Sequence, residues 1–253
     1  MRILLINPPI RIWSQPNCFP QGLGYIAQVL RKDHNVSIWD MNADRRDWHK
    51  IFKTVDQCFT WPETEEISEH LKDIDAVGIT GLITNYVMVK GLISFIKGFD
   101  PEIPIVVGGP LGTSIPEIML RKAGADICVI GEGEFTAQEL FRELDLCCHW
   151  SNVKESEVRG IAYLYDGWYS YNGNREAIKN INILPLPAYD LFPTEVYAKN
   201  PVGSSINKAK WIDGRAERPS RMEWELSTIK GEQTVPKSMN ILSSRGCAWR
   251  CVL

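Results

Sequence analysis

The stretch that decides the fold runs from residue 103 to residue 144. It opens with Ile-Pro-Ile-Val-Val-Gly-Gly-Pro (residues 103–110), and after a helical segment it continues with Asp-Ile-Cys-Val-Ile-Gly-Glu-Gly-Glu (residues 126–134). Each short apolar run ends in a glycine-bearing turn and leads into a segment of helical periodicity. Two buried strands joined through a helix form a unit whose strands are parallel.

The same alternation extends toward the N-terminus and predicts the fold class. We expect an α/β, Rossmann-like (flavodoxin-like) domain with a five-stranded parallel sheet in the order 2-1-3-4-5 and helices on both faces. Two capping boxes, Ser114 to Glu117 and Thr136 to Glu139, predict where the last two helices begin. The expected strands are 2–6, 35–40, 75–80, 103–108 and 126–130, and the expected helices are 22–32, 63–73, 84–97, 114–123 and 136–144.

The pattern changes after residue 150. Residues 159–171 predict a β-hairpin with Asp166-Gly167 at its turn, and a proline-punctuated segment follows over 184–193. Residues 198–238 are polar and typical of a linker or insertion, and 240–243 predict a new strand. We therefore expect a first domain over 1–150, a hairpin and connector over 151–238, and the start of a truncated domain over 239–253.

Composition bounds the class of protein. The chain has 253 residues, 44% hydrophobic and 23% charged, with a net charge of −3, which is an ordinary globular balance. The absence of a basic excess argues against nucleic-acid binding. The apolar runs are too short for a transmembrane segment, and the start of the chain is not a signal peptide, so we expect a cytoplasmic protein. Seven cysteines in such a chain argue against a disulfide framework.

The candidate ligand site is the edge at which the five strands end. In parallel α/β sheets, ligands bind outside the carboxyl ends of the strands. Glycine turns there let a backbone approach a ligand closely, while Glu132 and Glu134 would repel an anion, so a large neutral or amide-rich ligand fits best. The candidate cofactor-binding residues are Asn7, Pro8, Pro9, Thr80, Gly81, Thr84, Gly108, Gly109, Pro110, Gly131, Glu132, Gly133 and Glu134.

Two further motifs have competing interpretations. Gly22-Leu-Gly-Tyr-Ile-Ala27 matches a dinucleotide fingerprint, with Asp40 at the spacing of a ribose-binding acid. That fingerprint must directly follow the first strand, whereas residues 7–21 intervene here, so a helix start is the alternative. Cys247 and Cys251 could be half of an iron–sulfur site or two incidental cysteines.

Six segments in this order resemble the cobalamin-binding radical SAM enzymes, which include the anaerobic magnesium-protoporphyrin ester cyclase and many cobalamin-dependent methylases. The segments are Ile-Leu-Leu-Ile-Asn-Pro-Pro (3–9), Gly-Leu-Gly-Tyr-Ile-Ala (22–27), Val-Gly-Gly-Pro (107–110), Gly-Glu-Gly-Glu-Phe-Thr (131–136), Leu-Pro-Ala-Tyr-Asp-Leu-Phe-Pro (186–193) and Ser-Arg-Gly-Cys-x-x-x-Cys (244–251).

The resemblance implies cobalamin on the N-terminal domain, without a protein histidine on cobalt. It also implies a following barrel that holds a 4Fe-4S cluster and S-adenosylmethionine (SAM). Cys247 and Cys251 match the first two metal ligands of that cluster; the third would be residue 254, after Leu253. We therefore expect the N-terminal part of a methyltransferase or cyclase acting on an unknown small molecule, inactive by itself. A stand-alone corrinoid carrier and a nucleotide-binding flavodoxin-like domain are the alternatives.

Overall fold

The protein is described by a computed structural model that covers residues 1–10, 16, 18–44, 64–147, 153, 157–198, 210–212 and 215–217. Five parallel strands end at a common edge in this part of the chain. They are β1 (Arg2–Asn7), β2 (Asn35–Asp40), β3 (Ala76–Thr80), β4 (Ile105–Gly108) and β5 (Ile127–Val129). Each lies within a residue or two of the range expected from the sequence, because short apolar runs bounded by turns leave little freedom in placing a buried strand.

The parallel strands follow the expected order, and the hairpin extends their sheet. The full order is β2-β1-β3-β4-β5-β6-β7, in which β6 (Ile161–Tyr165) and β7 (Trp168–Tyr171) are antiparallel. The sheet therefore has seven strands instead of the five expected, because the hairpin pairs with the edge of β5 through Val129 and Ile161. That pairing covers an edge whose backbone groups would otherwise be unpaired.

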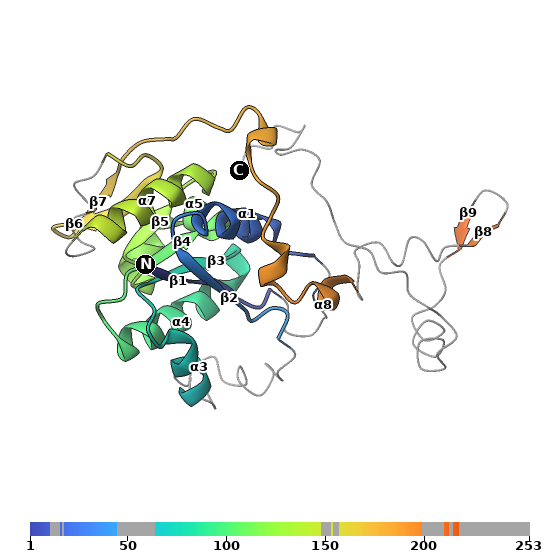
Figure 1. The fold of residues 1–253 in the computed structure, drawn as a ribbon, viewed down its shortest axis with the longest axis horizontal. Helices are drawn as coiled ribbons and strands as arrows, with labels where there is room; N and C mark the ends of the chain where they lie inside the picture. Colours follow the sequence, from blue (N-terminus) through green and yellow to red (C-terminus); the bar gives the residue numbers. More distant parts are fainter. Residues whose placement is uncertain are drawn as a thin grey trace. The chain divides into compact units, whose positions relative to one another are not determined.

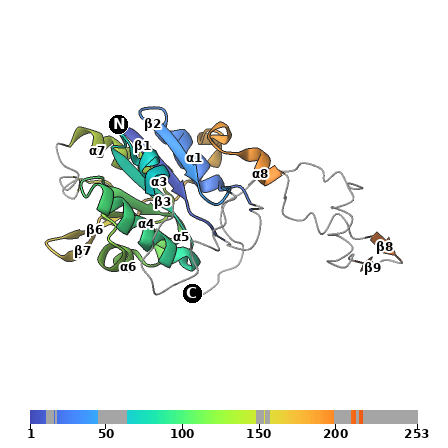
Figure 2. The ribbon, with the colours of Figure 1, turned by 90° about the horizontal axis from the view of Figure 1, so that it is seen from below.

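Helices cover both faces of the sheet (Figure 1). On one face, α1 (Gln21–Leu30) packs against α7 (Glu134–Leu146). On the other lie α3 (Thr64–Leu71), α4 (Tyr86–Phe99) and η2 (Met119–Ala123), and Figure 2, seen from below, shows α4 in front of the strands. Two short helices, η1 (Ile83–Asn85) and α5 (Gly109–Ser114), begin just after β3 and β4, and α6 (Pro116–Ile118) follows.

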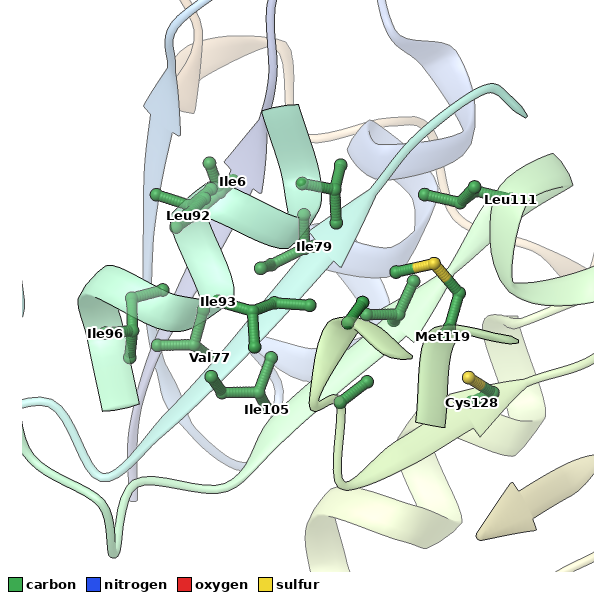
Figure 3. Packing of buried hydrophobic residues seen from close by; sticks show 14 of the residues in the cluster. Ile6, Val77, Ile79, Leu92, Ile93, Ile96, Ile105, Leu111, Met119 and Cys128 are labelled. Atoms are coloured by element: carbon green, nitrogen blue, oxygen red, sulfur yellow. The ribbon is translucent and has the colours of Figure 1, made fainter. Parts of the chain in front are cut away.

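The largest apolar cluster lies between the sheet and α4. Leu92, Ile93 and Ile96 on α4 face strand side chains such as Val77 and Ile105 (Figure 3). These side chains are at most 1% exposed, since positions four residues apart on a helix share a face and alternate positions on a strand do the same. This packing holds the strand ends in fixed positions relative to one another.

Neither Ser114 nor Thr136 caps a helix, although the helix expected over 114–123 is present as α6 and η2. The helix after β4 begins at Gly109, with Pro110 in its first turn, and it stops before Pro116 because Ile115 takes a non-helical conformation (φ −136°, ψ 48°). The helix after β5 begins at Glu134, so Thr136 lies inside the first turn instead of capping it. Both helices thus start directly at the strand ends.

The chain divides into two compact units, and the boundary differs from the one expected. The first contains residues 1–14 and 20–192, so the hairpin belongs with the sheet. The second contains residues 15–19 and 193–253. In its described part are α8 (Thr194–Ala198) and the antiparallel pair β8 (Lys210–Ile212) and β9 (Arg215–Glu217), within the stretch expected to be a linker. Phe19 packs edge-on against Tyr197, with ring centroids 5.8 Å apart.

Some expectations lie outside the described residues. These are the strand over 240–243, Cys247 and Cys251, and a further domain over 239–253 stays a prediction. Among the helices that are described, none is long and apolar enough to cross a bilayer.

Candidate functional site

The turns after β1, β3 and β4 meet at the point where the sheet changes its direction of winding. From β1 the chain crosses through α1 to β2 on one side, and from β3 it crosses through α4 to β4 on the other. Such a switch point leaves a crevice outside the strand ends, where α/β proteins bind ligands. We call the residues of these three turns, 7–10, 80–85 and 108–111, the rim. Nine of the candidate cofactor-binding residues lie in it.

A buried polar pair fixes the first turn of the rim. The Asn7 side chain donates a hydrogen bond of 2.8 Å to Asp40 at the end of β2, and these residues are only 3% and 7% exposed. Asn42 adds two bonds: its N–H donates to the Asn7 carbonyl (3.2 Å) and its Oδ1 accepts from the Ile10 N–H (3.0 Å). The turn that carries Pro8 and Pro9 is therefore held by the end of the neighbouring strand.

Asn85 joins the second turn to the first. Its Oδ1 accepts a hydrogen bond from the Leu82 N–H (2.8 Å), and its Nδ2 donates to the Pro9 carbonyl (3.2 Å). Asn85 is 5% exposed, whereas Thr84 beside it is exposed. Thr84 was the residue expected at this turn, yet Asn85 holds it, because a side-chain amide at the start of a helix can bond to nearby backbone groups.

The third turn is seated against the second by a close backbone approach. Gly109 has φ +70°, and a Cβ atom there would lie 2.7 Å from Thr80 Oγ1. The Leu111 N–H donates to the Gly81 carbonyl over 2.9 Å. Position 109 therefore requires glycine for two reasons: its backbone is left-handed, and it lies too close to β3 for a side chain.

The turn after β5 lies at the same edge but is held by other parts of the chain. Gly131 has φ +81°, and its N–H donates to Thr113 Oγ1 on α5 (3.1 Å). Glu132 accepts a hydrogen bond from the Ile178 N–H (2.5 Å), and Glu134 is only 3% exposed. Both carboxylates were expected to set the charge of an open edge, yet Glu132 has a protein partner and Glu134 is buried.

The exposed side chains of the rim are largely apolar. Ile10, Leu82 and Ile83 are 41%, 37% and 55% exposed, although they are large hydrophobic residues. Asp40, the carboxylate closest to the rim in the hydrogen-bond network, is buried. Exposed apolar groups gathered at one edge are typical of a binding site. This edge suits a large ligand without a strong charge.

Metal-ligating side chains do not gather within the described ranges. No three His, Cys, Asp or Glu side chains there are grouped as ligands would be. Burial raises the pKa of the Cys128 thiol to about 12, so this cysteine is protonated at neutral pH and is part of the core. The glycines of the proposed dinucleotide fingerprint, Gly22 and Gly24, lie inside α1 and not in the turn that follows β1.

A comparison with protein families identifies the domain. The family described as "B12 binding domain" matches residues 10–141, more than half of the 253 residues. This chain belongs to the B12-binding domain family. The matched residues contain β2 to β5, the second and third turns of the rim and the turn after β5, whereas β1 and residues 7–9 lie before the matched range.

Curated relatives of this B12-binding domain protein include methyltransferases. An uncharacterized methyltransferase of Pyrococcus horikoshii is 30% identical over 203 residues, which are 78% of this chain and 40% of that protein. The cytidylyl-2-hydroxyethylphosphonate methyltransferase of Streptomyces wedmorensis is 26% identical over 261 aligned positions, 99% of this chain and 47% of that protein. The chain thus spans less than half the length of both.

A solved structure shares the fold. The radical S-adenosylmethionine methyltransferase TsrM from Kitasatospora setae, with tryptophan substrate and a SAM analog bound, matches with a TM-score of 0.50 and 19% identity. The match covers 68% of this chain and 30% of that one. The Rossmann-like fold expected from the sequence is confirmed, and the B12-binding domain match confirms the cobalamin-binding part of the family resemblance.

Proposed function

We propose that this chain binds cobalamin at the rim and acts as the cobalamin domain of a radical SAM enzyme that methylates a small molecule. The observation that carries the proposal is the rim itself. It is a hydrogen-bonded platform of three turns, at the switch point of a B12-binding domain, whose exposed large side chains are apolar.

The residues present fit such a cofactor. A corrin ring is broad and apolar across its faces, with neutral amides at its margin. Ile10, Leu82 and Ile83 offer apolar contact, and glycine turns bring peptide groups within reach of amides. Asn7 to Pro9, Thr80 to Thr84 and Gly108 to Pro110 would hold the ring. Gly131 to Glu134 would contribute backbone groups, because the Glu132 carboxylate already accepts the Ile178 N–H.

The two methyltransferase relatives favour methyl transfer over cyclisation. When bound, cobalamin would supply the methyl-transfer chemistry, and the chain would position it and exclude water. Because the chain spans less than half of the relatives, a 4Fe-4S cluster, SAM and the roles of Cys247 and Cys251 belong to the proposal for the whole protein. It predicts that the full-length protein converts SAM to S-adenosylhomocysteine only when loaded with cobalamin.

The binding test uses anaerobic reconstitution with hydroxocobalamin, followed by desalting and a visible spectrum. We expect corrinoid absorbance to elute with the wild-type protein. Ile83→Arg, which places a charge on the exposed rim, should weaken binding by about 10-fold or more, since a desolvated charge opposes apolar contact.

The matched control is Phe99→Arg. Phe99 is also an exposed apolar residue (46%, against 55% for Ile83) and lies at the far end of α4, so this variant should bind like the wild type. A wild-type protein that elutes without corrinoid would refute cobalamin binding. Unchanged affinity in Ile83→Arg would refute the placement at the rim.

A further inference from the structure

One segment of the first unit belongs neither to the sheet nor to the helices that cover it. Residues 174–191, here called the strap, follow the hairpin and include η4 (Ile181–Ile183) and η5 (Tyr189–Leu191). The strap runs from β7 past α7 toward α1, as the gold ribbon of Figure 1 shows. It lies outside the residues matched to the B12 binding domain, 10–141.

Arg175 anchors the beginning of the strap to α7. Its Nε donates to Thr136 Oγ1 (2.9 Å), and its two terminal nitrogens bind the carboxylate of Glu139, with Nη1 3.0 Å from Oε1. The Arg175 side chain is only 19% exposed. Its partner Glu139 is 47% exposed, so the anchor rests on the defined geometry of a bidentate arginine–carboxylate pair and on the bond to Thr136.

Glu132 anchors the strap to the turn after β5. Its Oε2 accepts the Ile178 N–H over 2.5 Å, a charge-assisted hydrogen bond across 46 residues of sequence. Thr136 links the two anchors, because its hydroxyl lies 3.5 Å from the Glu132 carbonyl as well as beside Arg175. The strap is therefore tied to the edge at which the parallel strands end.

The far end of the strap is fixed to α1. The Ala188 N–H donates to the Gly24 carbonyl (3.0 Å), and Arg31 Nη1 lies 2.9 and 2.7 Å from the two carboxylate oxygens of Asp190. Pro185 and Pro187 restrict the backbone between the anchors, which lowers the entropy lost when the strap is ordered. The first unit ends at Phe192, directly after this anchor.

The turn after β5 needs such support. Gly131 and Gly133 flank Glu132. A Cβ atom at Gly133 would lie 3.1 Å from Ile26 Cδ1, whereas one at Gly131 would meet nothing within 4 Å, so side-chain packing confines Gly133 but leaves Gly131 free to move. A turn with two glycines has a large conformational freedom to lose when it orders against a ligand. A contact that orders the turn in advance removes that cost from binding.

We propose that the strap holds the turn after β5 in its ligand-binding shape, so that Glu132 and Arg175 are positioning residues for cobalamin. The inference rests on the proposed function, because it concerns the affinity of the same edge. In this proposal the Glu132 carboxylate binds the backbone of the strap and does not contact the ligand. It also makes Arg175, which belongs to neither the rim nor the turn, a determinant of cofactor affinity.

The experiment combines hydrogen exchange with a cobalamin titration. In cofactor-free protein, Glu132→Ala and Arg175→Ala should each accelerate amide exchange in peptides covering 176–190. Both should weaken hydroxocobalamin binding by about 10-fold, through the lost pre-ordering. Combining them should add little to either single change, since both release the same segment.

Conservative variants and a matched control separate positioning from general stability. Glu132→Gln keeps an acceptor oxygen and should recover most of the affinity and the slow exchange. Arg142→Ala breaks another arginine–carboxylate pair on α7, to Asp33 at 3.2 Å, without touching the strap, and should change neither measurement. Thermal unfolding of each variant verifies that it is folded.

Three outcomes would overturn the inference. Faster exchange in the strap with unchanged cobalamin affinity would show that the strap does not position the turn for binding. Weaker binding in Glu132→Ala but not in Arg175→Ala would make Glu132 a direct ligand contact. A wild-type protein that binds no cobalamin would refute the proposed function itself, and with it this role, while the exchange data would still report whether the anchors hold the strap.

Discussion

At the scale of single residues, position 112 requires glycine, because a close backbone contact leaves no room for a side chain. It lies in α5, where a Cβ atom would be 2.6 Å from the Val107 carbonyl oxygen and 3.2 Å from that of Val129. These atoms belong to the ends of β4 and β5, so neither can move without disturbing the sheet. The absence of a side chain lets α5 lie directly on the strand ends, next to the rim.

Gly112→Ala should therefore lower the free energy of unfolding by about 1–3 kcal/mol, the usual cost of overpacking. Denaturant unfolding would measure it. The control is Gly98→Ala in α4, where a Cβ atom meets nothing within 4 Å and alanine should stabilise the helix by up to about 1 kcal/mol. Equal effects of the two substitutions would contradict the close approach at Gly112.

His34 is a second residue whose behaviour follows from its surroundings. Its side chain is 3% exposed, and Nδ1 lies 3.6 Å from Asp145, with the ammonium of Met1 nearby. Burial, followed by that ammonium, lowers the pKa of His34 below its usual value, despite the opposing effect of Asp145. The folded state thus favours the neutral imidazole.

This shift makes stability depend on pH. Between the lowered pKa and the unfolded value of about 6.5, the unfolded chain binds more protons than the native one. His34 therefore contributes stability above that window, and the contribution is lost as the pH falls through it, at no more than about 1.4 kcal/mol per pH unit. His34→Gln should flatten the fall in unfolding free energy between pH 7 and pH 5. Parallel profiles for both proteins would contradict the assignment.

At the scale of elements, the hairpin of β6 and β7 is a case in which a local sequence pattern is sufficient to predict the structure. Asp166 and Gly167 both have positive φ, 49° and 79°, as a type I′ turn requires. The strands on either side pair in the expected register, with Tyr165 opposite Trp168. The dipeptide alone specifies this geometry, because few residue types adopt two successive left-handed conformations.

Gly167→Ala should thus destabilise the protein by about 1 kcal/mol, since alanine pays a steric cost at positive φ. Asp166→Asn should stay within about 0.5 kcal/mol of the wild type, because asparagine tolerates that region. Thermal or denaturant unfolding of the two variants provides the comparison. A larger loss in Asp166→Asn than in Gly167→Ala would argue against the type I′ turn.

The starts of α5 and α7 show where local patterns mislead. Ser114 and Thr136 have the spacing of capping residues, yet neither caps a helix. Ser114 is the last residue of α5, the next helix begins at Pro116 after Ile115, and α7 begins at Glu134. The Thr136 hydroxyl is used by Arg175 of the strap. A capping motif states only which local bonds are possible, and tertiary partners decide which of them form.

At the scale of the whole molecule, binding at the rim should stabilise the fold. The rim joins strand ends that the unfolded chain separates, so cobalamin should bind the native state alone. Hydroxocobalamin at 100 times its Kd should raise the unfolding free energy by about 2.7 kcal/mol. The increase should disappear in Ile83→Arg. A wild-type protein whose stability does not change at saturating cofactor would contradict binding at a site formed by folding.

The sequence by itself determined the parallel strands, their order, the hairpin turn and the edge at which the strand-end turns gather. Those features follow from apolar periodicity and glycine turns, which act over a few residues and are visible in any single strand or turn. The family resemblance came from motifs of the same local kind.

Only the tertiary structure decided how that edge is held. The bonds from Asn7 to Asp40, from Asn85 to Pro9 and from Ile178 to Glu132 span 33, 76 and 46 residues. The attachment of the hairpin to β5 and the course of the strap likewise join distant segments. Such contacts depend on which distant parts of the chain lie side by side once the core has packed, and a local sequence pattern does not predict this.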